Sequence, residues 1–144
     1  MDNSLIDTYR TTDYRVRLAQ GGWVSIQVDA ALPASLHSLI GERNWAFITA
    51  WNPGSQAQPL AQNRAAQQAL LIALRKLPRT TCIRPGLGVG DAWREASLFV
   101  VGPSLADIDE LAQQFQQNAY VHGLGHGYAR LRLSSDRPPH AQAG

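Results

Sequence analysis

The chain has 144 residues, of which 44% are hydrophobic, and its formal net charge is +2. This length is enough for one domain with a buried core, whereas two separate domains of half the length would each be marginally stable. The basic residues form no run that could follow a phosphate backbone, which argues against nucleic acid as a partner.

Three features of the sequence favour a cytoplasmic protein without a metal or cofactor. Cys82 is the single cysteine, so neither an intrachain disulfide nor a cysteine-based metal site can form. The first four residues lack the basic and apolar segments of a signal peptide. No apolar run approaches the roughly 20 residues that a membrane span needs. We expect no membrane contact.

The N-terminal part of the chain predicts a β-hairpin followed by a short helix. Residues 1–12 are polar, and we expect them to be frayed. Residues 14–18 and 24–28 alternate apolar and polar side chains, and two glycines between them allow a tight turn. A proline and a glycine then bound a short helix over residues 33–41.

The middle of the chain predicts two strands on either side of a long helix, then a loop and a further strand. Residues 45–51 suit a buried strand, and a helix opens at Asn63 and stops before Pro78. A short strand covers 80–83, and the glycines and prolines of Arg84–Gly90 indicate a loop. The run 96–101 is the most strand-like in the chain, and we expect it to be central.

A second long helix and two strands complete the prediction. Ser104 and Asp107 fit a capping box at the start of the helix, and Asn118 suits a left-handed C-cap after it. Residues 119–122 and 128–133 are expected strands.

From residue 45 onward this order is that of a ferredoxin-like β-α-β-β-α-β sandwich. We therefore predict an α+β fold with an added N-terminal β-hairpin and an extra C-terminal strand, and with both long helices on one face of the sheet. The expected single domain covers residues 1–133. Residues 134–144 lack apolar periodicity and are expected to form a disordered tail.

Several short motifs together resemble an uncharacterised bacterial family known as domain of unknown function 3293. They are Phe47-Ile-Thr-Ala-Trp-Asn-Pro53, Asn63-Arg64, Trp93 with Glu95 and Ser97, and Phe115-x-Gln117-Asn-Ala119. The resemblance runs from about Tyr14 to about Leu133, and its first motif is the specific one. The family pattern has glycine where Gln116 stands, so this chain departs from it there. The resemblance implies one fold and no known activity.

The loop that follows the strand 45–51 is the first candidate site. Asn52 and Ser55, with exposed backbone N–H groups, could bind a polar ligand, and Trp51 could form an apolar wall. The alternative is a structural turn in which Asn52 bonds its own backbone, because Asn-Pro-Gly-Ser is a strong turn sequence.

The start of the following helix offers a second pair of candidates. Asn63 would cap the helix. Arg64 sits where the positive helix end disfavours a cation, so it could be offset by an anionic ligand or by Glu95. The alternative is that Arg64 simply points to solvent.

The entry to the central strand offers the third group. By alternation Trp93, Glu95 and Ser97 share one face of the strand, where Trp93 could form an apolar wall. A covered Glu95 would need a partner, and a buried, paired carboxylate is also how enzymes prepare a general base. The alternative is a structural ion pair. Gln117 could donate amide hydrogen bonds to a ligand or merely cap the second helix.

Two further patterns are weaker indications of a functional site. The glycines at 86, 88 and 90 match neither a dinucleotide-binding nor a P-loop fingerprint, and we interpret them as a mobile loop that could cover a site. His122 and His126 lack a third ligand and predict no metal centre.

Three functional hypotheses follow, and the sequence leaves open whether the protein is an enzyme. The preferred one is a binding domain that holds a small polar or anionic metabolite at the Asn52 loop. The second is an enzyme on a nucleotide-like or amide substrate with Glu95 as general base. The third is a protein-interaction module, or a homodimer, that uses the edge strand 128–133 or the N-terminal hairpin.

Overall fold

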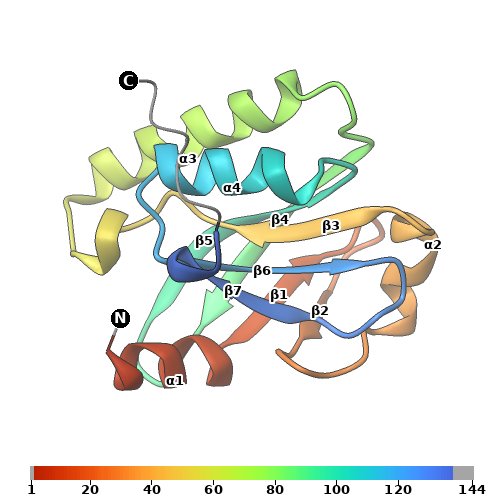
Figure 1. The fold of residues 1–144 in the computed structure, drawn as a ribbon, viewed down its shortest axis with the longest axis horizontal. Helices are drawn as coiled ribbons and strands as arrows, with labels where there is room; N and C mark the ends of the chain where they lie inside the picture. Colours follow the sequence, from red (N-terminus) through yellow and green to blue (C-terminus); the bar gives the residue numbers. More distant parts are fainter. Residues whose placement is uncertain (1, 138–144) are drawn as a thin grey trace.

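A seven-stranded antiparallel sheet organises the protein, and its strand order is β2-β1-β4-β5-β3-β6-β7. The structure is a computed structural model that describes residues 2–137 (Figure 1). The strands are β1 (Asp13–Arg17), β2 (Trp23–Ile26), β3 (Asn44–Ile48), β4 (Cys82–Val89), β5 (Arg94–Val101), β6 (Ala119–Leu124) and β7 (Arg130–Leu133). The helices are α1 (Asn3–Thr11), α2 (His37–Ile40), α3 (Leu60–Lys76) and α4 (Leu105–Gln114), with 3-10 turns η1 (Ala34–Leu36), η2 (Pro53–Ser55) and η3 (Ser134–Asp136). The predicted α+β class is confirmed.

The sheet is covered on both faces, because alternate residues of its central strands point to opposite sides. On one face α3 and α4 pack side by side, as expected (Figure 1). Ile48, Leu70 and Ile108 belong to the buried core under these helices. On the other face Phe47 and Phe99 join a second core that η1 and α2 cover.

The strand order explains how the N-terminal hairpin joins the domain. β5 is the fourth of seven strands, so the prediction of a central strand at 96–101 is confirmed. β1 pairs with β4, so the hairpin extends the sheet, and β2 and β7 form its two edges. No helix within residues 2–137 has the length and apolar character that crossing a bilayer requires.

The expectation that residues 1–12 are frayed is wrong. Residues 3–11 form α1, and Asp2 caps the helix by accepting a hydrogen bond from the backbone N–H of Ser4 at 2.7 Å. The hydroxyl of Tyr14 donates to the backbone carbonyl of Tyr9, which ties the end of α1 to β1. No residue of α1 is fully buried, and its apolar side consists of three half-buried residues, Leu5, Ile6 and Tyr9, which make a much shorter stripe than those of α3 and α4.

The expectation of a loop at Arg84–Gly90 is also wrong, because β4 continues through Val89. Glycine is required here for close approach rather than for flexibility. A Cβ atom on Gly86 would lie 2.8 Å from the ring of Phe47, and one on Gly90 would overlap the indole of Trp93. The glycines at alternate positions therefore accept aromatic rings on one face of a regular strand.

The C-terminal region needs a smaller correction. The first residues of the expected tail form η3, in which Asp136 accepts a hydrogen bond from the N–H of Leu133 at 2.8 Å. Arg137 then donates to the backbone carbonyl of Gln117 at 3.1 Å. Residues 138–144 lie outside the described residues.

The left-handed residue after α4 is Gln116, with φ of 55°, and not Asn118 as predicted. Glycine is the residue that adopts this conformation without a steric cost, and it is also the residue that the resemblance leads us to expect at this position. Its side chain is exposed and its carbonyl accepts a hydrogen bond from the N–H of Gly54 at 2.6 Å. Gln116 therefore occupies a strained backbone position.

We expect Gln116→Gly to raise the free energy of unfolding by roughly 0.5–1 kcal/mol, because glycine removes the left-handed strain. Urea unfolding of the two proteins measures this difference. The matched control is Gln114→Gly, at a helical position of the same helix, which should lower stability by a similar amount. A loss of stability in both variants would contradict the interpretation that the backbone of Gln116 is strained.

Candidate functional site

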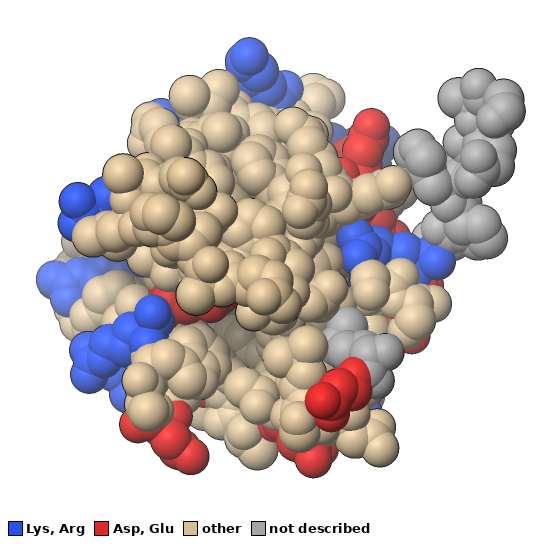
Figure 2. Space-filling model, turned by 90° about the vertical axis from the view of Figure 1, so that its left-hand side faces the viewer, with Lys and Arg blue, Asp and Glu red and all other residues tan. Residues whose placement is uncertain are grey.

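Two connected hollows lie at one end of the sheet, on the face opposite α3 and α4. At this end β3 and β4 finish, while β1, β5 and β6 begin. The inner cavity has a volume of about 40 Å³, and the outer pocket beside it about 150 Å³. Tyr9, Trp93, Glu95 and Gln117 line both hollows, so they form the junction between them. Figure 2 shows this side of the molecule hollowed, with an acidic side chain at the edge of the hollow.

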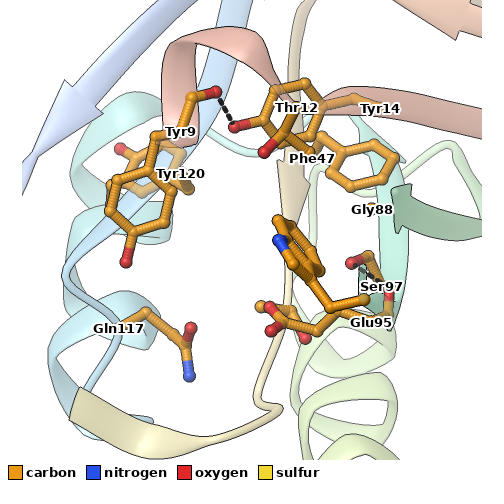
Figure 3. A pocket seen from close by; sticks show the side chains of 12 residues that line it. Tyr9, Thr12, Tyr14, Phe47, Gly88, Glu95, Ser97, Gln117 and Tyr120 are labelled. Carbon is orange, nitrogen blue, oxygen red and sulfur yellow. Dashed lines mark hydrogen bonds between the residues drawn. The ribbon is translucent and has the colours of Figure 1, made fainter. Parts of the chain in front are cut away.

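The inner cavity is lined mainly by aromatic and hydroxyl side chains from α1 and five strands or their ends. Besides the junction residues, its lining consists of Thr12, Tyr14, Phe47, Thr49, Gly88, Ser97, Ala119 and Tyr120. Figure 3 shows the Glu95 carboxyl, the Gln117 amide and the Tyr9 hydroxyl directed toward one open space. The outer pocket adds Leu5, Thr8, Trp51, Asn52 and Ser55.

Glu95 is the central group of the site. The alternation of β5 places it on the same face as Ser97 and Phe99, as predicted. Its side chain is half-buried, and its carboxylate has no hydrogen bond or ion pair with any side chain or backbone group in residues 2–137. Burial raises the pKa of Glu95 to about 7. A carboxyl group in this state can either accept a hydrogen bond or exchange a proton near neutral pH.

Gly88 is the one glycine among the residues that line the inner cavity. A Cβ atom at this position would lie 3.6 Å from the ring of Trp93 and 3.8 Å from the methyl group of Thr12, so it would make ordinary van der Waals contacts with both. Trp93 itself packs over Gly90 with the nitrogen edge of its indole, and turns its six-membered ring toward Gly88. Of the three glycines that the sequence suggested as a cover over a site, Gly88 lines the inner cavity, while Gly86 and Gly90 contact the rings of Phe47 and Trp93.

A reciprocal pair of asparagines holds the loop beside the site. Asn63 is buried, and its Oδ1 accepts a hydrogen bond from the N–H of Asn52 at 2.8 Å. Its Nδ2 donates to Oδ1 of Asn52, also at 2.8 Å, while Gln58 Nε2 donates to Asn63 Oδ1 at 2.6 Å. Asn52 has a left-handed backbone, which asparagine tolerates well. The predicted capping role of Asn63 is wrong, since α3 begins at Leu60 and Asn63 supports the loop instead.

Two other contacts fix the same loop. Gln117 is buried, and its Nε2 donates to the backbone carbonyl of Trp51 at 3.2 Å. The hydroxyl of Ser55 accepts a hydrogen bond from Asn118 Nδ2 at 3.0 Å and is bonded to the hydroxyl of Tyr9 at 2.9 Å. Burial also raises the pKa of Tyr9. The loop is thus tied to α3, to the α4–β6 connection and to α1.

The structure brings together most of the residues that the sequence singled out. The outer pocket is lined by six of the eight candidates, namely Trp51, Asn52, Ser55, Trp93, Glu95 and Gln117. Asn63 lies behind the loop, as described above. Arg64 is exposed, lines neither hollow, and forms no ion pair with Glu95 among the described residues. No lysine or arginine lines either hollow.

The sequence did not reveal the contribution of the N-terminal region. Tyr9 and Thr12 come from the segment expected to be frayed, and Tyr14 was assigned only to a strand. Gly88 was detected as part of a glycine pattern but assigned to a loop. The usable signal was the spacing of two between the glycines, which places all three on one face of a strand.

Comparison with protein-family models matches residues 48–120 to the family described as "Protein of unknown function (DUF3293)". The match covers just over half of the chain. The chain belongs to the DUF3293 family. The DUF3293 segment extends from the last residue of β3 to the second residue of β6, so it contains Asn52, Gly88, Glu95 and Gln117. No curated protein and no solved structure matched the chain.

Proposed function

We propose that this protein binds a small polar molecule in the inner cavity and outer pocket, with Glu95 as its main polar contact. The observation that carries the proposal is a half-buried carboxylate at the junction of two hollows, with no partner from residues 2–137. A buried group of this kind costs stability unless something bonds to it. A ligand that bonds to Glu95 would remove that cost.

The proposal moves the site away from the Asn52 loop alone. The side chains of Asn52 and Asn63 are bonded to each other, so they hold the rim of the outer pocket. Trp51 and Ser55 line that rim, and Trp93 forms a wall of both hollows.

We also propose that the protein works in the cytoplasm of a bacterium. We propose further that its core has a ferredoxin-like arrangement, which the strand order β4-β5-β3-β6 supports.

Filling the inner cavity tests the proposal. We expect small polar fragments to shift the backbone amide resonances of Gly88, Glu95 and Gln117 in the wild-type protein. Gly88→Leu should weaken this binding by about tenfold or more, because its side chain would occupy the cavity. Gly88→Ala, which adds one methyl group in ordinary contact, should fold normally and weaken binding less.

The matched control is Ala69→Leu, which adds the same side chain to an exposed position of α3 and should bind fragments like the wild type. Fragment-induced shifts that cluster elsewhere would contradict the proposal. Equal affinity of the wild-type and Gly88→Leu proteins would contradict it as well.

One observation favours a second function, an enzyme with Glu95 as general base. A base acts best when its pKa lies near the working pH, and burial brings the pKa of Glu95 to about 7. The cavity beside it is large enough for a reacting group. Turnover of amide or nucleotide-like compounds that disappears in Glu95→Gln would establish this function.

The structure gives less support to an interaction surface at the edge strand β7 than to a binding site at Glu95. Arg132 makes a close ion pair with Asp109 at 2.8 Å, and Arg130 pairs with Asp29, also at 2.8 Å. Tyr120 donates to Asp109 at 2.6 Å. The arginines that could have contacted a partner are therefore already bonded within the domain, while Tyr128 is the exposed aromatic residue just before the strand.

A further inference from the structure

Most hydroxyl groups that line the inner cavity present acceptors to it rather than donors. Each hydroxyl has a single proton, and four of them give that proton to a backbone carbonyl. The four hydrogen bonds run from Thr12 to Thr8, from Tyr14 to Tyr9, from Thr49 to Ala96 and from Ser97 to Glu95. A ligand can therefore bond only to the lone pairs of these oxygens, and Thr49 Oγ1 already accepts one hydrogen bond from the N–H of Trp51 at 3.0 Å.

The side-chain amide of Gln117 also presents an acceptor to the cavity. Its Nε2 donates to the carbonyls of Trp51 and Phe115, both at 3.2 Å, which uses both amide protons. Its Oε1 has no donor from residues 2–137, and the side chain points toward the open space that Glu95 also faces (Figure 3). An ionised Glu95 is likewise an acceptor only.

The remaining donors near the junction lie at its margin. The nitrogen edge of the Trp93 indole packs over Gly90, and its carbon edge faces Gly88. The hydroxyls of Tyr9 and Ser55 are bonded to each other, which uses one of their two protons and leaves a single O–H donor in this pair. Neither hollow has a basic side chain in its lining, so an anion would meet acceptors and a carboxylate without a counter-charge.

The geometry points to a small organic cation as the ligand, with an ammonium, amidinium or guanidinium group between Glu95 and the amide oxygen of Gln117. This inference rests on the proposed function and specifies its ligand class. Such groups have only donors, so they match a lining in which acceptors outnumber donors. The rings of Tyr9 and Trp93 at the junction add the aromatic surfaces on which cations are held favourably.

The size of the hollows limits the ligand further. The inner cavity, at about 40 Å³, accommodates the charged group and little more. The outer pocket, at about 150 Å³, accommodates a short substituent that leaves between Trp51 and Ser55. A monoamine or a monosubstituted guanidine therefore fits better than a large heterocycle.

Three probes of nearly equal size and different charge test the ligand class, namely propylammonium, propanol and propionate. Their binding is compared at equal ionic strength and at about pH 8, where Glu95 is mostly ionised. We expect propylammonium to shift the amide resonances of Gly88, Glu95 and Gln117, with an affinity about tenfold or more above that of propanol. Propionate should not bind at this site. Glu95→Gln, which keeps the shape of the side chain, should weaken propylammonium binding by about tenfold or more, while the exposed Glu110→Gln should not change it.

The outcomes separate the ligand class from the proposed function. Tighter binding of propanol or propionate at the same resonances would overturn the cationic ligand, yet binding that is lost in Gly88→Leu would still support the pocket. Unchanged propylammonium affinity in Glu95→Gln would also overturn the cationic ligand. If none of the three probes shifts these resonances, the inference is overturned, and the wider fragment screen then decides the proposed function separately.

Discussion

Glu95→Gln should stabilise the protein by about 3 kcal/mol near pH 8 and change its stability little near pH 4. Burial raises the pKa of Glu95 from 4.5 to about 7, so the folded protein holds this proton more tightly than the unfolded chain does. Stability is therefore highest below the unfolded pKa and falls as the pH rises from about 4.5 through 7. Glutamine does not ionise, so it removes this fall.

Urea unfolding of the wild-type and Glu95→Gln proteins at several pH values between about 4 and 8 measures the effect. The two stability curves should separate progressively above about pH 5. The exposed Glu110→Gln on α4 is the control, and it should follow the wild-type curve. Parallel curves for the wild-type and Glu95→Gln proteins, or a loss of stability in the variant at high pH, would show that Glu95 is well solvated or paired.

Asn63→Ala should destabilise the protein by about 2–4 kcal/mol, since it leaves several buried polar groups without partners. The N–H of Asn52 and the amide of Gln58 would lose their acceptor, and Oδ1 of Asn52 would lose one of its two donors, keeping the N–H of Gln58. Asn63 is only 3% exposed, so water cannot easily replace it. The neighbouring Gln62→Ala, on the exposed side of α3, is the matched control and should change stability by less than about 0.5 kcal/mol.

A double-mutant cycle with Asn52→Gly isolates the pair, because glycine keeps the left-handed backbone and removes only the side chain. We expect the two substitutions to be strongly non-additive, with an interaction free energy of roughly 1–2 kcal/mol. Additive effects would mean that the two asparagines act independently. A small effect of Asn63→Ala alone would contradict its role in holding the loop.

The parts of the fold with a clear apolar period could be predicted from the sequence. The alternation in β1 and β2 and the stripes of α3 and α4 placed these elements correctly, and the capping box of Ser104 and Asp107 is present. The misassigned regions lack such a pattern. α1 buries no residue, and β4 contains glycine where a strand normally has bulky side chains.

The candidate site could be predicted in part, again where a local sequence pattern was present. Strand alternation placed Glu95 on the correct face, and the strand end placed Trp51 and Asn52 beside it. The pairing of Glu95 with Arg64 was an assumption about distance that no local pattern could test. The contribution of Tyr9 depends on α1 folding back over the sheet, which is a tertiary contact between distant segments of the chain.

The unpaired state of Glu95 links the stability of the protein to its proposed function. A stable protein gains nothing from a half-buried carboxylate without a partner, and functional sites commonly retain such groups at a cost in stability. The same substitution, Glu95→Gln, should therefore increase stability near pH 8 and weaken binding of the ligand. This opposite response would not arise from a purely structural residue.

The pKa of Glu95 itself is the most direct test of this account. The chemical shift of its side-chain carboxyl carbon, followed by nuclear magnetic resonance as the pH is varied, would measure this pKa. The resonance of Glu95 is the one that is missing from the spectrum of the Glu95→Gln protein. We predict a pKa of about 7, with no ion pair needed to explain it. A value near 4.5 or below would contradict the account, because it would mean that Glu95 is exposed to water or bonded to a cation in the folded protein.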